Sequence, residues 1–142
     1  NALALALDKA GITSVVVDPL DRAKQTAGSF DGRTSAIALA SVRILEHVGA
    51  WQHIAPHAQP INDIRVCDQN KPGIVHYNHK DLGDEPFGYI TENRVLRDAL
   101  YKALDDTKHV TQINPAKVSG FCRNAQSITA QLEGGAEITA PF

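Results

Sequence analysis

The residues best placed to do chemistry begin with Asp18, an acid that directly follows the β-branched run 12–17, ITSVVV. In a dinucleotide-binding βαβ unit, an acid at the end of the second strand accepts hydrogen bonds from a ribose hydroxyl. The plainer interpretation is a solvated turn acid in front of Pro19. Both interpretations stay open while this stretch is considered alone.

Arg33 is the second candidate, because Thr34 or Ser35 is predicted to cap a helix that Gly49 closes. The helix dipole disfavours a cation at a helix start. Water can screen such a cation, which is one explanation of its place. The other is that Arg33 shares an anion, such as a phosphate, with the free N–H groups of the first turn.

The third candidate group is Glu92-Asn93-Arg94, which ends the strand-like run FGYIT and begins an amphipathic helix. Glu92 or Asn93 is expected to cap this helix. The apolar stripe expected along the helix is Val95, Leu96, Ala99, Leu100, Ala103 and Leu104. Three polar groups at one helix start either only cap it or also hold a ligand.

The elements that position these residues follow from periodicity and turn signals. Residues 2–10 favour a helix closed by Gly11, and 12–17 read as a buried strand. Residues 19–32 are expected to form a loop. Short strands are expected in INDIRVCD, GIVHYNH and FGYIT, separated by QNKP and DLGDEP, and further strands in HVTQI, AKVSGFC and SITAQLEGGAEITA, with a hairpin turn at Gly134-Gly135. The fold class is therefore α/β (α+β).

The amino-acid composition narrows the classes of function that the chain can have. The 142 residues are 43% hydrophobic and 21% charged, with a net charge of -2, which is globular and gives no reason to expect nucleic acid as a partner. No apolar run approaches the roughly 20 residues that span a bilayer. Cys67 and Cys122 form no ligand or disulfide motif, and the histidines lack acidic or thiol partners at ligand spacing, so no metal site is expected and a cytoplasmic setting is favoured.

Three stretches carry a resemblance to a known family: ALALALDKAGITSVVVDP, FDGRTSAIALASVRILEHVGAW and DLGDEPFGYITENRVLRDAL. In this order they resemble the FAD-dependent aromatic hydroxylases of the p-hydroxybenzoate hydroxylase fold, and within them the polyprenyl-phenol hydroxylases of ubiquinone biosynthesis. The resemblance implies that Asp18 contacts the adenosine ribose of FAD and that Arg33 lies on the pyrophosphate side. It places Asn93, with its neighbour Arg94, beside the ribityl and phosphate portion.

The departures from the family imply an internal fragment. The glycine-rich loop would end before Asn1, and a Gly-Asp-Gly type segment would follow Phe142. The expected domains are 1–60, a partial FAD-binding βαβ region; 61–91, antiparallel strands of the substrate-domain type; and 92–142, a helix and strands returning to the FAD domain. The chain alone is expected to be inactive, to bind FAD weakly or not at all, and to associate with itself because apolar surface is left exposed.

For the whole enzyme, the resemblance implies a monooxygenase that uses FAD, NAD(P)H and O2 to hydroxylate a phenolic ring. The substrate would be a small aromatic compound or a polyprenyl-phenol, and a membrane-associated biosynthetic complex at the inner membrane is one possible partner. No residue of the chain stands out as a catalytic acid, base or nucleophile. The alternatives are a flavin hydroxylase of a soluble aromatic compound and a non-catalytic nucleotide-binding module.

Overall fold

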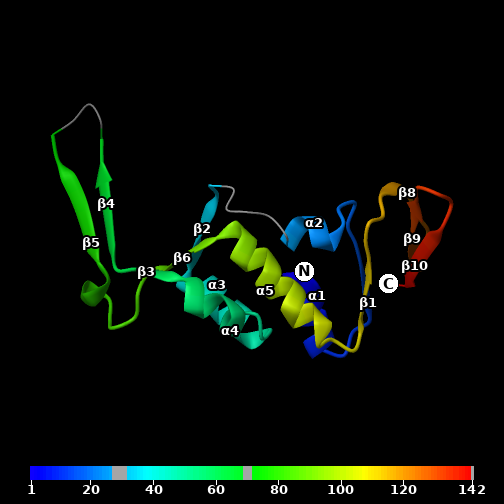
Figure 1. The fold of residues 1–142 in the computed structure, drawn as a ribbon, viewed down its shortest axis with the longest axis horizontal. Coiled ribbons are helices and arrows are strands. Elements are labelled where there is room, and N and C mark those ends of the chain that lie inside the picture. Colours follow the sequence, from blue (N-terminus) through cyan, green and yellow to red (C-terminus); the bar gives the residue numbers. More distant parts are fainter. Residues whose placement is uncertain (27–31, 69–71, 142) are drawn as a thin grey trace. The chain divides into compact units, whose positions relative to one another are not determined.

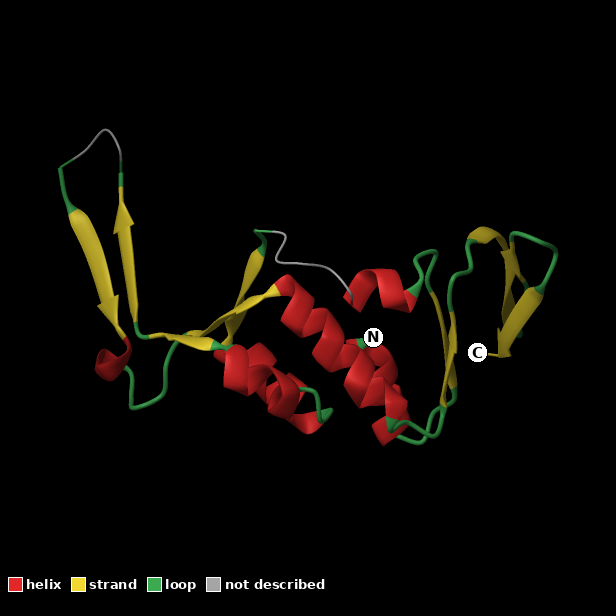
Figure 2. Cartoon of the chain, viewed as in Figure 1, coloured by secondary structure: helices red, strands yellow, loops and turns green. Residues whose placement is uncertain are grey.

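The structure is a computed structural model that describes residues 1–26, 32–68 and 72–141. Helices and strands are mixed along the chain, and its last four elements, β7 to β10, are all strands (Figures 1 and 2). The chain divides into two compact units, one comprising Asn1, Leu3–Gly28 and Thr107–Phe142, the other Ala2 and Ser29–Asp106. Mixed helices and strands, with one parallel pair and several antiparallel sheets, confirm the predicted α+β class.

The first unit is built around a parallel strand pair. Its elements are α1 (Ala2–Lys9), β1 (Ser14–Val17), α2 (Arg22–Thr26), β7 (Val110–Ile113), β8 (Val118–Arg123), β9 (Ser127–Leu132) and β10 (Glu137–Pro141). Ala2, the first residue of α1, is grouped with the second unit. Strand β1 pairs with β7 in parallel, with Ser14 opposite Val110. Strands β8, β9 and β10 form an antiparallel sheet with β9 in the centre. The predicted turn at Gly134-Gly135 joins β9 to β10, and both glycines have positive φ.

Asp8 ties the end of α1 to the start of β7. Its Oδ1 accepts hydrogen bonds from the backbone N–H groups of Lys108 at 3.0 Å and of His109 at 2.7 Å. The His109 hydrogen bond is the main reason that the pKa of Asp8 lies below its usual value. One carboxylate thus joins segments that are a hundred residues apart in the sequence.

In its described residues, the second unit has three further helices and two antiparallel sheets. Its elements are β2 (Thr34–Ala38), α3 (Leu39–His47), α4 (Trp51–Ile54), the 3-10 turn η1 (Ala55–His57), β3 (Gln59–Ile61), β4 (Asp63–Cys67), β5 (Ile74–Asn78), the 3-10 turn η2 (His79–Asp81), β6 (Gly88–Glu92) and α5 (Asn93–Asp105). Strand β6 lies between β2 and β3, antiparallel to both. Strands β4 and β5 form a separate two-stranded ribbon.

The core of the second unit lies where the helices meet the β2–β6–β3 sheet. Trp51 of α4 packs edge-on against Tyr89 of β6, with ring centroids 5.0 Å apart. The buried residues of this unit are Ile37, Val42, Leu45, Val48, Ala50, Ile54, Thr91, Ala99, Tyr101, Ala103 and Leu104. Burial of Ala99, Ala103 and Leu104 agrees with the predicted α5 stripe, whereas the burial of Tyr101 was not predicted.

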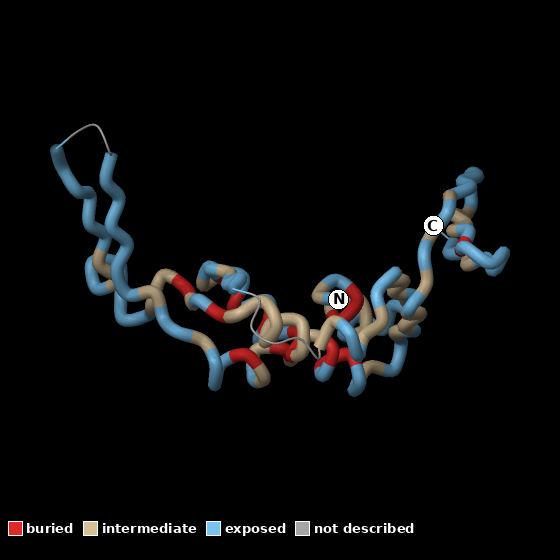
Figure 3. Tube along the Cα trace, turned by 45° about the horizontal axis from the view of Figure 1, so that its top comes forward, coloured by how far each residue is buried: buried red, intermediate tan, exposed pale blue. Residues whose placement is uncertain are grey.

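The β4–β5 ribbon is amphipathic and exposed (Figure 3). Its register pairs Ile64 with Tyr77 and Val66 with Val75, so these four side chains share one face. All four are at least 39% exposed. The predicted antiparallel ribbon is therefore confirmed; its connecting segment QNKP falls largely on residues 69–71, which lie outside the described residues.

Three local predictions were wrong. Residues 34–38 form strand β2 instead of the first turn of a helix, because β6 offers them an antiparallel partner that outweighs the helix propensity of alanine. Helix α3 begins only at Leu39, so neither Thr34 nor Ser35 is an N-cap, although Gly49 does follow the helix end with φ 79°. Residues 22–26 of the predicted loop form α2, where Asp21 Oδ1 accepts from the Ala23 N–H at 2.7 Å; residues 27–31 lie outside the described residues.

Replacing Gly88 by alanine is expected to destabilise the protein. A Cβ atom at this position would lie 2.2 Å from the backbone oxygen of Ile37, and strand backbone cannot move aside cheaply. We expect a loss of at least about 2 kcal/mol and a fall in Tm of about 5 °C or more. The matched control is Gly120→Ala in β8, where the nearest atom is the flexible side-chain oxygen of Gln131 at 3.3 Å. Equal melting temperatures for the two variants would contradict this account.

Replacing Asp8 by asparagine is expected to remove a pH-dependent part of the stability. Because the folded-state pKa of Asp8 is lowered, its contribution is complete at neutral pH and is lost as the pH falls through that lowered pKa. The melting temperatures of the wild-type protein and Asp8→Asn should therefore differ at pH 7 and converge in acid. Asp106→Asn is the matched control, because no described residue donates a hydrogen bond to its carboxylate. A constant difference for Asp8→Asn would refute the linkage.

Candidate functional site

Three of the four predicted cofactor residues meet in the second unit, at the end of the sheet where β2 begins and β6 ends. We call Arg33, Ser35, Glu92, Asn93 and Arg94 the Arg33–Asn93 corner. The backbone N–H of Asn93 donates to the carbonyl oxygen of Arg33 at 3.1 Å. Thr34 lies opposite Glu92 in the strand register, so the pairing of β2 with β6 brings residues 33 and 93 together.

Asn93 is fixed by a side-chain hydrogen bond that spans 58 residues of sequence. Ser35 Oγ donates to Asn93 Oδ1 at 2.6 Å. With the amide oxygen used in this way, Asn93 presents its Nδ2 group as a donor, and no other described residue pairs with it. Ser35 was predicted as a helix cap; its role in the corner was missed, because only the strand pairing brings it next to Asn93.

Helix α5 begins at this corner without a side-chain cap. Glu92 takes the N-cap position as predicted, yet within the described part of the chain neither it nor Asn93 makes a capping hydrogen bond from its side chain. Glu92 forms an ion pair with Arg94 Nε instead. The first-turn N–H groups of a 13-residue helix thus adjoin two arginine positions, and such a helix start attracts anions.

Arg33 does not occupy the place that was predicted for it. It precedes strand β2, not a helix, because residues 34–38 pair with β6. The helix N-terminus next to it is that of α5, reached through the Asn93 N–H bond to its carbonyl oxygen. The predicted position of Arg33 at the start of the helix that follows it is therefore wrong, and the helix start beside it is that of α5.

Asp18 lies in the first unit, directly after β1. Its Oδ1 accepts a hydrogen bond from the Leu20 N–H at 2.8 Å, and its backbone groups bond Ile113 and Ala116. The carboxylate is thus held in a turn, as the plainer interpretation predicted. Its second oxygen, Oδ2, has no donor within the described residues and can accept from a ligand hydroxyl.

Each of these two places, taken by itself, offers groups that suit one part of an anionic nucleotide. The corner combines an α5 start that lacks a side-chain cap among the described residues with two arginines and the Asn93 amide group, and its Glu92 carboxylate is neutralised by Arg94. Asp18 supplies an acceptor suited to a sugar hydroxyl. The corner can therefore hold phosphate groups and the strand end can hold a ribose.

Sequence comparison finds relatives over nearly the whole chain. It is 38% identical over 140 residues to ubiquinone hydroxylase UbiL of Rhodospirillum rubrum, covering 99% of this chain and 32% of the relative. It is 31% identical over 142 residues to 3-demethoxyubiquinol 3-hydroxylase of Escherichia coli, covering 99% of this chain and 36% of the relative. The chain thus spans about a third of the length of these relatives. No protein-family model matches it.

Solved structures show the same fold. p-Nitrophenol 4-monooxygenase PnpA of Pseudomonas putida DLL-E4 superposes with a TM-score of 0.76 at 19% identity, over 99% of this chain and 36% of that protein. PqsL of Pseudomonas aeruginosa, described as a probable FAD-dependent monooxygenase, gives 0.72 at 17% identity, over 96% of this chain and 36% of that protein. Together these findings confirm the resemblance: the chain is a homologue of ubiquinone-biosynthesis hydroxylases and has the fold of about a third of an FAD-dependent monooxygenase.

Proposed function

We propose that this chain is the part of a longer FAD-dependent monooxygenase that holds a portion of the cofactor, and that the whole enzyme hydroxylates a phenolic ring in ubiquinone biosynthesis. The observation that carries the proposal is the identity to two ubiquinone hydroxylases over 99% of the chain. NAD(P)H and O2 are the proposed co-substrates.

The proposed cofactor residues are Asp18, Arg33, Asn93 and Arg94. Arg33 and the first turn of α5 would bind phosphate oxygens, since both offer positive charge and N–H donors. Asn93 would donate through Nδ2, because Ser35 already occupies its Oδ1. Arg94 would offset the Glu92 carboxylate, which would otherwise repel a phosphate. Asp18 would accept from a ribose hydroxyl through Oδ2.

The chemistry that FAD supplies when bound is the activation of O2 for oxygen insertion into an electron-rich ring. The residues of this chain would bind and orient the cofactor, and we assign none of them as a catalytic acid, base or nucleophile. Without the remaining two thirds of such an enzyme, the chain by itself is proposed to be inactive and to bind FAD weakly.

The ubiquinone branch is preferred to its alternatives because the sequence identity lies with ubiquinone hydroxylases. A flavin hydroxylase of a soluble aromatic compound would share the fold, and a nucleotide-binding module without catalysis would need only the Asp18 region. A polyprenyl-phenol substrate would place the enzyme in the cytoplasm at the surface of the inner membrane, in a biosynthetic complex. Within residues 1–26, 32–68 and 72–141, no helix is both long and apolar enough to cross a membrane.

The coding DNA on both sides of this segment tests the proposal directly. An upstream strand with a GxGxxG loop and a downstream Gly-Asp-Gly segment are expected, and the protein encoded by the complete frame should retain FAD and consume NAD(P)H when given a polyprenyl-phenol. A complete frame that encodes neither motif, or a purified protein that binds no flavin, would refute it.

Arg33→Ala in that complete protein is expected to weaken FAD binding about tenfold or more, because a charge-assisted hydrogen bond to a phosphate is lost. The readout is the flavin released during dialysis, followed by its fluorescence. Arg65→Ala, on the exposed β4–β5 ribbon, is the matched control and should bind FAD as the unchanged protein does. Equal flavin retention by the two variants would remove Arg33 from the proposed site.

The 142-residue chain on its own is expected to associate with itself through the apolar ribbon face formed by Ile64, Val66, Val75 and Tyr77. Light scattering should give a mass above that of the monomer, rising with concentration. Val75→Lys puts a charge on this face and should lower the mass, whereas Ile74→Lys, on the opposite face, should not. A monodisperse wild-type monomer would contradict the expectation.

A further inference from the structure

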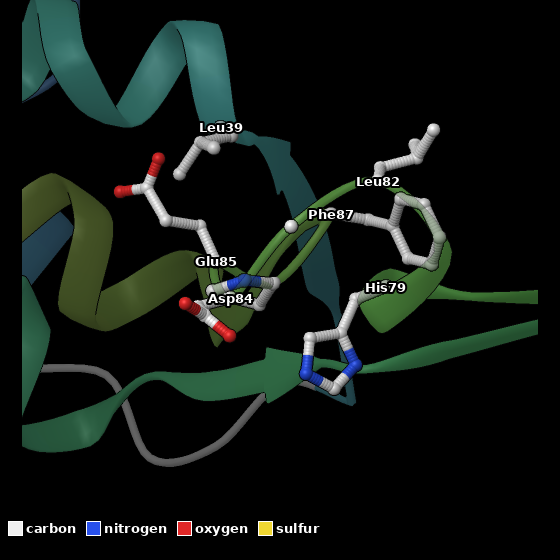
Figure 4. A pocket seen from close by; sticks show the side chains of 8 residues that line it. Leu39, His79, Leu82, Asp84, Glu85 and Phe87 are labelled. Atoms are coloured by element: carbon white, nitrogen blue, oxygen red, sulfur yellow. The ribbon is translucent and has the colours of Figure 1, made fainter.

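A hollow of about 300 Å³ opens in the second unit, away from the residues assigned to FAD. It is lined by Leu39 at the start of α3, by His79 of η2 and by the loop Leu82–Phe87 (Figure 4). Its volume lies at the lower end of the range for small-molecule sites, which suits a ligand of about one ring.

The walls of the hollow are held by backbone hydrogen bonds. The N–H of Phe87 donates to the carbonyl oxygen of Ile61 at 3.0 Å, and the N–H of Leu39 donates to the carbonyl oxygen of Phe87 at 3.0 Å. Arg43 of α3 forms an ion pair with Glu85 in the loop. A ligand would therefore meet a largely preformed site and would not have to order the loop.

His79, which lines the hollow, keeps a free acceptor on its ring. Its Nδ1 lies 3.0 Å from the carbonyl oxygen of Asn62. A carbonyl oxygen can only accept, so Nδ1 carries the proton and the neutral ring keeps its lone pair on Nε2. No described residue donates to Nε2, which leaves it available for a ligand.

Asp84 supplies a second acceptor. Unlike Glu85, whose carboxylate is paired with Arg43, the Asp84 carboxylate has no donor among the described residues. In the view of Figure 4, Leu39 lies at the top of the hollow, and His79 and Asp84 lie below it. The two side-chain groups of the lining that have no partner among the described residues are thus acceptors, and a ligand that complements them must bring donors.

The rest of the lining is apolar. Leu39, Pro86 and Phe87 contribute hydrocarbon surface, and Leu82 at the rim is 84% exposed. Covering this surface with a flat ring would remove apolar area from water, which is favourable. A small cation would satisfy Asp84 but would leave Leu82 and Phe87 uncovered.

We propose that this hollow binds the hydroxylated aromatic ring of a phenol, with the phenolic O–H donating to Asp84 and His79 Nε2 accepting from a second hydroxyl where the ring carries one. The inference rests on the proposed function in that it assigns a place to the phenolic substrate. Asp84 and His79 are then positioning residues that set the preference for hydroxylated rings.

Fluorine NMR of small probes tests this on the 142-residue chain without FAD. We expect 4-fluorophenol to show saturable line broadening with a Kd of about 1 mM, a value usual for a single-ring ligand. 4-Fluoroanisole, which lacks the donor, should bind about fivefold more weakly. 4-Fluorocatechol, with a second hydroxyl for His79, should bind about threefold more tightly than 4-fluorophenol.

Asp84→Asn should weaken 4-fluorophenol binding about fivefold, because the charged acceptor is lost. Folding should be unaffected, since no described residue depends on this carboxylate. Asp81→Asn in η2 removes the same charge nearby from a residue that does not line the hollow, so its binding should stay within about twofold of the unchanged chain.

Several outcomes would overturn the proposal. These are no saturable binding of 4-fluorophenol, equal binding of 4-fluoroanisole, equal effects of Asp81→Asn and Asp84→Asn, or tighter binding of 4-fluorobenzylamine, which would indicate a cation site. Binding of phenol by the chain does not depend on flavin. If the chain binds phenol but the complete protein retains no FAD, the proposed function is refuted and the phenol site stands. If the complete protein retains FAD but the chain binds no phenol, the phenol site is refuted and the proposed function stands.

Discussion

The antiparallel pairing of β2 with β6 is the contact on which the second unit depends. It requires Gly88, because the backbone of Ile37 leaves no room there for a Cβ atom. Helix α3 starts from the end of β2 and α5 from the end of β6, so the register of this one pair sets where both helices begin. A slip of one residue would turn either Ile37 of β2 or Thr91 of β6 out of the core and would separate Ser35 from Asn93.

The parts of the fold that could be predicted from the sequence are those fixed by neighbours along the chain. Helix α1 with Gly11, the α5 stripe and the Gly134-Gly135 turn follow from local propensity and positive φ at glycine. Residues 34–38 could not be predicted in the same way. Their alanines favour a helix in isolation, and only pairing with a strand that lies 50 to 58 residues later in the sequence makes them β.

The residues of the candidate site likewise differ in whether neighbours along the chain or distant segments determine their place. Asp18 was found because a strand followed by an acid is a local pattern, and its place at the end of β1 agrees with the structure. The role of Ser35 could not be predicted, because only the β2–β6 register brings it next to Asn93. The Glu92–Arg94 ion pair could not be predicted either, because Glu92 was expected to use its side chain to cap α5. The hollow beside His79 was missed for a similar reason: the carbonyl that orients its ring belongs to Asn62, 17 residues earlier.

The length of the β2–β6 pair also sets the distance between the features at its two ends. Strand β2 leads from Arg33 to Leu39 and β6 returns from Phe87 to Asn93, so the Arg33–Asn93 corner and the hollow beside His79 lie at opposite ends of the same two strands. Five residues of strand measure about 17 Å. A single ligand that contacts both ends must therefore be at least about that long. Removing one residue from each strand would bring the two ends about 3.4 Å closer together, so the length of this sheet sets the spacing between the corner and the hollow.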